Sequence, residues 1–113
     1  MRPAEYITKV EEILADPKNW VKGNWATNGR NQIVPAASKK AKKFDLAGAF
    51  IHVAPPLSDK EETEQWFIAR QAFRIVLMAE YGDGEEIISF NDHKATTHDE
   101  VLKLLRETRE RLS

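Results

Sequence analysis

The sequence contains no cysteine. Disulfide bonds, thiolate metal ligands and cysteine nucleophiles are therefore excluded, and the composition is that expected in a reducing cytoplasm. Long apolar runs are also missing. The most apolar window, residues 66–79, is interrupted by Arg70, Gln71 and Arg74 and is too short to span a bilayer. The first 17 residues lack the apolar centre of a signal peptide. We therefore expect a cytoplasmic protein without a membrane-spanning segment.

An excess of charge of either sign is missing as well. Seventeen lysine and arginine residues stand against eighteen aspartate and glutamate residues, so the overall charge favours neither a nucleic acid nor a membrane as partner. The run Lys39, Lys40, Lys42 and Lys43 is the local exception. Nucleic-acid binding through Lys39–Lys43 is a weaker alternative, because a short lysine run in a loop is usually only solvated.

What is present is the composition of a folded globule. The chain has 113 residues, of which 42% are hydrophobic and 31% charged, and this is enough for one domain with a core. No internal repeat, low-complexity tract or linker interrupts it. We expect residues 1–113 to form a single domain.

Helical patterns dominate the chain. Apolar residues recur at helical spacing from Tyr6 to Leu14, and Pro17 ends the run. The alanine-rich stretch from Phe44 to Ala54 predicts a buried helix. A capping box at Ser58–Glu61 predicts a helix that reaches Tyr81, and a second box at Thr97–Glu100 opens the last helix.

Two segments predict strands. Asn28-Gly29, between Trp20–Trp25 and Ile33–Val34, is a strong hairpin signal. Glu86–Phe90, which follows the turn signal Gly82-Asp83-Gly84, is typical of a short additional strand. The order of elements predicts a small, mostly helical α+β domain with about four helices, a β-hairpin and one further strand.

The helix from Ser58 to Tyr81 is apolar on more than one face from Trp66 onward. We predict that it is the central helix, wrapped by the other elements in a monomer. The alternative is that a second copy covers the remaining apolar face in a symmetric dimer. The apolar faces of the other elements favour the monomer.

Several short motifs, taken in order, resemble a family of uncharacterised small bacterial and phage proteins. The family shows a Trp-x-x-Gly-x-x-Ala segment, a Trp-Cys-x-x-Gly-Ala helix, a Trp-Asn-Asp turn and a closing Glu-Val-Leu-x-Leu-Leu helix. The matching residues are Trp20, Gly23, Ala26 and Gly29; Phe44, Gly48 and Ala49; Phe90, Asn91 and Asp92; and Glu100, Val101, Leu102, Leu104 and Leu105. Asp45 replaces the cysteine of the family and Phe90 its second tryptophan. The resemblance implies a shared fold and carries no activity.

The polar cluster after Phe90 is the first candidate site. Asn91, Asp92 and His93 follow an apolar run, and His98 and Asp99 come soon after. The histidine spacing matches no metal signature, and Asn and Asp side chains commonly close turns onto backbone N–H groups. We therefore predict a structural turn, and we expect neither a metal nor another cofactor.

Asp45 and His52 are the second candidate pair. A carboxylate in an apolar helix is costly if it is buried without a partner, so we expect Asp45 to face solvent at the helix N-terminus. The alternative is an internal pair with His52, Arg70 or Arg74. His52 is interpreted as a core or boundary histidine that bonds to the backbone.

The tryptophans suggest how the protein acts. Trp66 is expected in the core, whereas Trp20 and Trp25 on the hairpin are equally consistent with core and with an exposed platform. We predict a non-enzymatic binding or accessory protein of bacterial or phage type with a protein partner. The predicted contact residues are Trp20, Trp25, Arg30, Asn91, Asp92 and His93. The alternative is a small-molecule or catalytic site formed by Asp45, His52, Asn91, Asp92 and His93.

Overall fold

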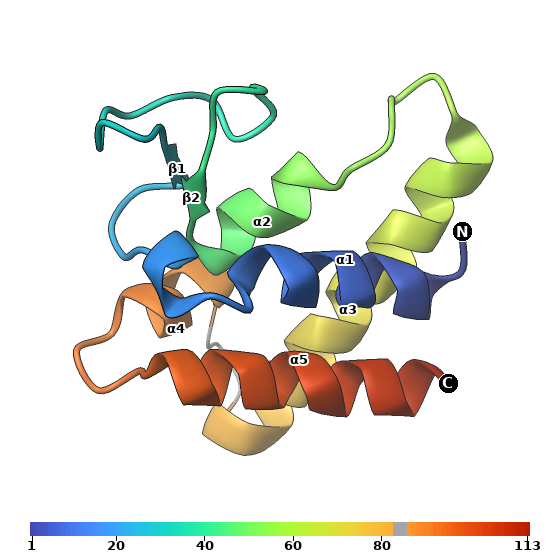
Figure 1. The fold of residues 1–113 in the computed structure, drawn as a ribbon. Helices are drawn as coiled ribbons and strands as arrows, with labels where there is room; N and C mark the ends of the chain where they lie inside the picture. Colours follow the sequence, from blue (N-terminus) through green and yellow to red (C-terminus); the bar gives the residue numbers. More distant parts are fainter. Residues whose placement is uncertain (83–85) are drawn as a thin grey trace.

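Helices form most of the computed structural model, which describes residues 1–82 and 86–113 (Figure 1). The α-helices are α1 (Pro3–Leu14), α2 (Leu46–His52), α3 (Lys60–Tyr81), α4 (Ile87–Asp92) and α5 (His98–Leu112). A short 3-10 helix, η1 (Pro17–Asn19), and two strands, β1 (Ala26–Thr27) and β2 (Lys43–Phe44), complete the described elements. The predicted α+β class with a helical majority is confirmed.

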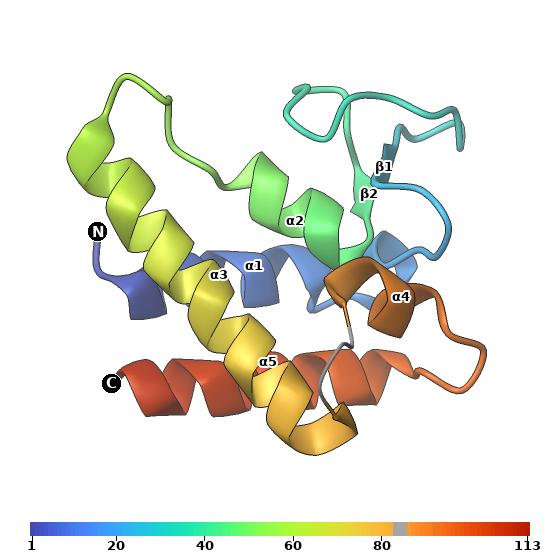
Figure 2. The ribbon, with the colours of Figure 1, turned by 180° about the vertical axis from the view of Figure 1, so that it is seen from behind.

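The core lies among α1, α3 and α5. Helices α1 and α5 run side by side, and α3 crosses behind them (Figures 1 and 2). Each helix buries an apolar stripe with helical spacing. The buried residues are Ile7, Val10 and Leu14 in α1, Phe73, Val76 and Leu77 in α3, and Val101, Leu104 and Leu105 in α5. Arg109 of α5 donates a hydrogen bond from Nε to Glu11 Oε1 of α1 at 2.6 Å and holds the pair in register.

The helix starts follow the capping signals, with one shift. The Thr97 hydroxyl accepts a hydrogen bond from the N–H of Glu100, as the second capping box predicts. In α3 the N-cap is Asp59 and not Ser58, and the Asp59 carboxylate accepts from the N–H of Glu62. The start of α3 is therefore one residue later than the spacing Ser58–Glu61 predicted.

The small sheet differs from the predicted hairpin. Strand β1 pairs antiparallel with β2, with Ala26 opposite Phe44 and Thr27 opposite Lys43. The turn after Asn28 does form, because Asn28 donates its N–H to the carbonyl of Gln32 at 2.9 Å, and a single bridge links Thr27 to Ile33. However, the predicted strand partners, Trp20–Trp25 and Ile33–Val34, do not form a ladder. Phe44 is buried whereas Ile33 is 74% exposed, so the contact of β1 with β2 contributes more to the core than its contact with Ile33 does.

The predicted strand Glu86–Phe90 is wrong. The segment forms α4, in which Ile87, Phe90 and Asn91 are buried and Ile88 and Ser89 are exposed. Burial at positions i, i+3 and i+4 is the period of a helix and not of a strand. Of the turn signal before it, Asp83 and Gly84 lie outside the described residues.

Helix α3 is not wrapped as predicted. Its buried residues are Ala69, Phe73, Val76 and Leu77. Three large apolar side chains on its other side remain exposed: Phe67 (50%), Ile68 (42%) and Ile75 (56%). The described elements cover one side of the helix. In Figure 2, the view from behind, α3 lies in front of α1 and α5, with no other element drawn over it.

Helix α2 begins at Leu46, later than predicted, because Phe44 belongs to β2 and Asp45 is the N-cap. Gly48 in its first turn packs directly against the backbone of Trp25. A Cβ at this position would lie 1.8 Å from the Trp25 carbonyl oxygen. Only glycine permits this approach, and the segment that carries Trp25 is held against α2 as a result.

Candidate functional site

Asn91 is the centre of a buried polar cluster that joins three segments. Its side chain is fully buried. Asn91 Oδ1 accepts hydrogen bonds from Trp20 Nε1 at 2.6 Å and from the N–H of Leu46 at 3.1 Å. Its amide nitrogen donates to the carbonyl of Val21 at 3.0 Å. These bonds use both the oxygen and the nitrogen of the side-chain amide, and Asn91 therefore fixes α4 against α2 and against the segment before β1.

Asp92 and His93 also form structural contacts. Asp92 Oδ1 accepts a hydrogen bond from the N–H of Gly23 at 2.8 Å, and His93 Nδ1 accepts from the N–H of Ala95 at 3.1 Å. The side chain of His93 thus bonds within a local turn, whereas the turn was predicted to depend on Asn91 and Asp92. Asn91 and Asp92 differ from that prediction, because they end a helix and bond to backbone groups far away in the sequence.

Asp45 is buried, with 1% of its surface exposed, and the prediction that it faces solvent is wrong. Its carboxylate caps α2 by accepting a hydrogen bond at Oδ1 from the N–H of Gly48 at 2.6 Å. Burial raises the pKa of Asp45 to about 6, because a charged carboxylate loses its hydration in the interior. The Gly48 bond opposes this shift, and the negative charge of Asp92 adds to it.

The raised pKa of Asp45 predicts a stability that depends on pH. Since the folded-state value lies above the ordinary value of 3.8, the folded protein holds this proton more tightly than the unfolded chain. The resulting stability is complete below pH 3.8 and is lost as the pH rises through about 6. Asn can form the same cap without titrating. The melting temperature of Asp45→Asn minus that of the wild type should therefore increase across this window. A difference independent of pH would contradict the assignment.

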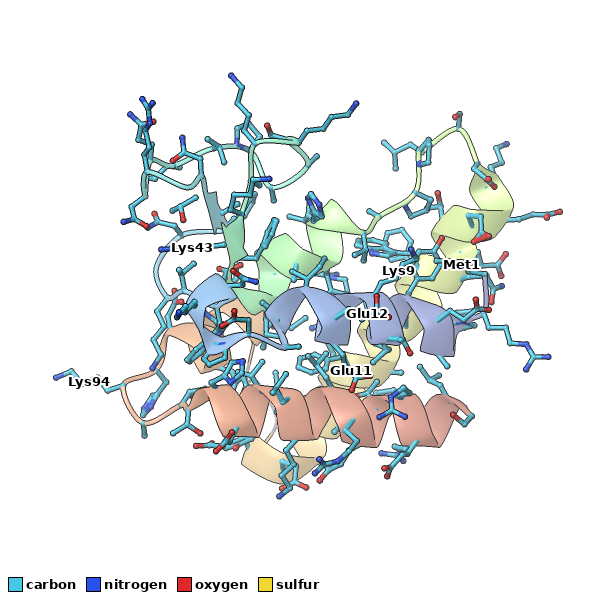
Figure 3. The ribbon with its side chains drawn as sticks, in the orientation of Figure 1. Met1, Lys9, Glu11, Glu12, Lys43 and Lys94 are labelled. Carbon is cyan, nitrogen blue, oxygen red and sulfur yellow. The ribbon has the colours of Figure 1, made fainter. Side chains whose placement is uncertain are left out.

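His52 lies apart from Asp45, at the opposite end of α2. Its Nδ1 is 2.7 Å from the carbonyl oxygen of Ala36, and its ring packs against Phe44 at 4.7 Å between centroids. The predicted boundary histidine that bonds to the backbone is confirmed. His52 borders an open hollow of about 480 Å³ with Lys9 and Glu12 of α1, and Figure 3 shows these two α1 residues on the near face of the molecule. The structure thus groups Asp45, Asn91 and Asp92 but does not bring His52 to them.

The tryptophans have three different environments. Trp20 is half-buried and is held by Asn91, with Lys22 Nζ 5.4 Å from the centroid of its ring. Trp66 is half-buried against the core, and its Nε1 donates to the carbonyl of Phe50 at 2.9 Å. Trp25 is 53% exposed. Arg30 is exposed in the turn that follows β1. Of the predicted contact residues, Trp25 and Arg30 are thus exposed, Trp20 is half-buried and Asn91 is fully buried.

Trp25 borders a groove that the sequence did not reveal. The groove lies between α2, α3 and α4 and has a volume of about 520 Å³. Its walls are mainly apolar, with Arg70 and Glu86 as charged groups. The lining residues are Trp25, Ala47, Ile51, Trp66, Arg70, Glu86, Ile87, Ile88 and Ser89.

The exposed side of α3 continues this groove. The ring of Phe67 packs edge-on against that of Trp66, with 5.1 Å between centroids, and Phe67 shares a shallow apolar hollow of about 370 Å³ with Ile68 and Ile75. We call the groove and this side of α3 together the apolar face. The helical period of 3.6 residues places Phe67, Ile68 and Ile75 on the side opposite Ala69, Phe73 and Val76, but because both sides are apolar the sequence does not indicate which of them is open.

Within residues 1–82 and 86–113, no group of three or more histidine, aspartate or glutamate side chains is placed to hold a metal ion. Nor does any helix in the same part of the chain have the length and hydropathy needed to cross a bilayer.

Comparison with known proteins gives a family but no activity. No curated protein and no solved structure matches the chain. One family model matches residues 1–111, nearly the whole sequence, and its description is "Family of unknown function (DUF6197)". This agrees with the resemblance seen in the short motifs. The chain belongs to the family of unknown function DUF6197.

Proposed function

We propose that this chain is a non-enzymatic protein-binding module of bacterial or phage type, which acts in the cytoplasm, and that the apolar face is its contact surface. The absence of cysteine supports the compartment. The polar groups nearest to a catalytic cluster, Asp45, Asn91 and Asp92, make structural hydrogen bonds to backbone, which favours binding over catalysis.

The observation that supports this proposal is the gathering of large exposed apolar side chains on one face. Three segments contribute them, and each side chain exposes between 42% and 56% of its surface: Trp25, Phe67, Ile68, Ile75 and Ile88. Scattered apolar residues are normal on a protein surface, but a contiguous apolar patch is typical of an interaction site. The Trp66–Phe67 contact makes this patch contiguous from the groove to α3.

Arg70 indicates the chemistry of the partner. It is half-buried in the groove, and among the described residues it has no ion pair, whereas its neighbour Arg74 lies 3.4 Å from Glu86. A partner segment with apolar anchors at helical spacing and one carboxylate would fill the groove and pair with Arg70. An amphipathic helix meets both requirements.

Charge substitution on the apolar face tests the proposal. When the tagged chain is purified from the source organism, the Ile68→Glu/Ile75→Glu variant should recover at least about tenfold less of a specific partner protein than the wild type does. Binding would have to remove water from each new carboxylate, which weakens the contact. The matched control is Ile33→Glu/Leu57→Glu, which alters two apolar residues that are 74% and 86% exposed in loops. Equal recovery with both double variants would contradict the proposal.

Light scattering separates a partner protein from a second copy. We expect the wild type to have the mass of a monomer. A dimer that becomes monomeric in Ile68→Glu/Ile75→Glu would instead assign the apolar face to self-association, the arrangement that the sequence left as the alternative.

A further inference from the structure

Charge is unevenly distributed along the chain, although its total is close to zero. Residues 17–44 contain seven basic residues and no aspartate or glutamate: Lys18, Lys22, Arg30, Lys39, Lys40, Lys42 and Lys43. The remainder of the chain holds ten basic and eighteen acidic residues. The near-neutral total therefore conceals a basic segment on an acidic body.

The fold gathers this segment into one lobe, which we call the basic lobe. The turn that carries Arg30 and the loop that carries the lysine run project from the same end of the molecule in both views (Figures 1 and 2). Two contacts join them: the N–H of Lys42 donates to the carbonyl of Thr27 at 2.8 Å, and Lys43 Nζ donates to Asn31 Oδ1 at 2.7 Å. Arg30 thus lies beside the lysine run, which is not apparent from their separation in the sequence.

Most of these cations have no internal role. Lys22 bonds to the carbonyls of His93 and Thr96, and Lys43 bonds to Asn31. The other five, Lys18, Arg30, Lys39, Lys40 and Lys42, are exposed and make no ion pair with any described residue. Figure 3 shows that Lys94, from the loop before α5, extends from the same side of the molecule as Lys43.

We propose that the basic lobe binds the phosphate backbone of a nucleic acid. Several exposed cations on one lobe are the electrostatic footprint of such a surface. Asn31 and Gln32, which are exposed in the same lobe, provide amide groups that can donate to phosphate or base edges. Trp25 is the one residue that the apolar face draws from residues 17–44, and the cations of the basic lobe lie outside that face, so the two surfaces can be substituted separately.

Fluorescence anisotropy with a labelled DNA of mixed sequence, as duplex and as single strand, tests this inference. We expect binding with a Kd of about 10 µM or tighter at low salt. If the lobe contacts about four phosphates, raising the salt concentration from about 50 to about 200 mM should weaken the affinity roughly 100-fold. No binding at low salt, or binding that is insensitive to salt, would overturn the proposal.

Two quadruple variants with equal charge change locate the surface. Arg30, Lys39, Lys40 and Lys42, all replaced by Gln, should weaken DNA binding at least about tenfold. The control replaces the exposed residues Lys9, Lys60, Arg106 and Arg111 by Gln and should leave the Kd within about threefold of the wild type. Equal loss in both variants would show only an effect of net charge and would overturn the assignment.

A polyglutamate competitor distinguishes a nucleic acid from an acidic protein. We expect unlabelled DNA to displace the labelled probe at a much lower concentration of negative charges than polyglutamate requires. Displacement at the same charge concentration would assign the basic lobe to an acidic protein surface instead.

Discussion

Phe73→Ala should lower the free energy of unfolding by about 3–5 kcal/mol, the scale of a large-to-small substitution in a core. Phe73 is fully buried where α3 meets the other helices, and its ring packs against Phe50 at 5.6 Å between centroids. The substitution removes these contacts and leaves a cavity. A loss of this size is a large fraction of the total stability of a small domain. Urea denaturation measures it directly.

Ile75→Ala is the matched control for Phe73→Ala. Ile75 lies in the same helix, two residues away, but is 56% exposed. Its substitution should change the free energy of unfolding by no more than about 0.5 kcal/mol. Similar losses in both variants would show that the two sides of α3 are equally packed and would contradict the apolar face.

Gly48→Ala should have the second large effect. The added Cβ would lie 1.8 Å from the carbonyl oxygen of Trp25 and 2.6 Å from its carbonyl carbon. Backbone atoms cannot rotate away, so the segment that carries Trp25 must move away from α2. Overpacking of this kind costs about 1–3 kcal/mol and sometimes more. Thermal unfolding measures the loss, and the tryptophan fluorescence of the folded variant reports the displacement.

Gly29→Ala is the control for this prediction, because a Cβ at Gly29 has no atom within 4 Å. We expect its melting temperature and fluorescence to match those of the wild type. A stable Gly48→Ala with unchanged fluorescence would mean that the Trp25 segment is not held against α2 in this way.

The sequence predicted α1, α3 and α5 well because the signals that start and end these helices act locally, whereas the short helix α4 was predicted as a strand. These signals act within a few residues: Pro3 is the first residue of α1 and Pro17 follows its end, and Thr97 caps α5. The short strands failed for the opposite reason. Ala26 pairs with Phe44 and also accepts a hydrogen bond from the N–H of Val34. The turn signal at Asn28 is local and could indicate only the second of these contacts.

For the polar residues too, the sequence could indicate a general role but not the partners that tertiary packing supplies. The sequence could indicate that Asn91 and Asp92 are structural, since both commonly bond to backbone groups. It could not indicate that their partners would be Leu46 and Gly23, because those contacts exist only after α4 has packed against α2. Asp45 was misplaced for a related reason. Its cost of burial was recognised, but the hydrogen bond from Gly48 that offsets this cost depends on the helix starting at Leu46.

The apolar face was missed because excess apolar residues in α3 have two explanations. Apolarity on several sides of a helix predicts either complete burial or a contact with another molecule. The sequence of residues 66–78 is compatible with both explanations. Only the positions of α1, α2 and α5 show which side remains open, and they leave Phe67, Ile68 and Ile75 exposed.

Site-specific photo-crosslinking in the source organism tests the apolar face most directly. A photoreactive phenylalanine analogue at position 75 should give a discrete adduct with one protein, and the adduct should disappear when Phe67→Glu is added. The same analogue at position 57, where Leu57 is 86% exposed in a loop, should give no such adduct. Adducts of equal yield at both positions, or none at position 75, would contradict the account of α3 as a protein-binding surface.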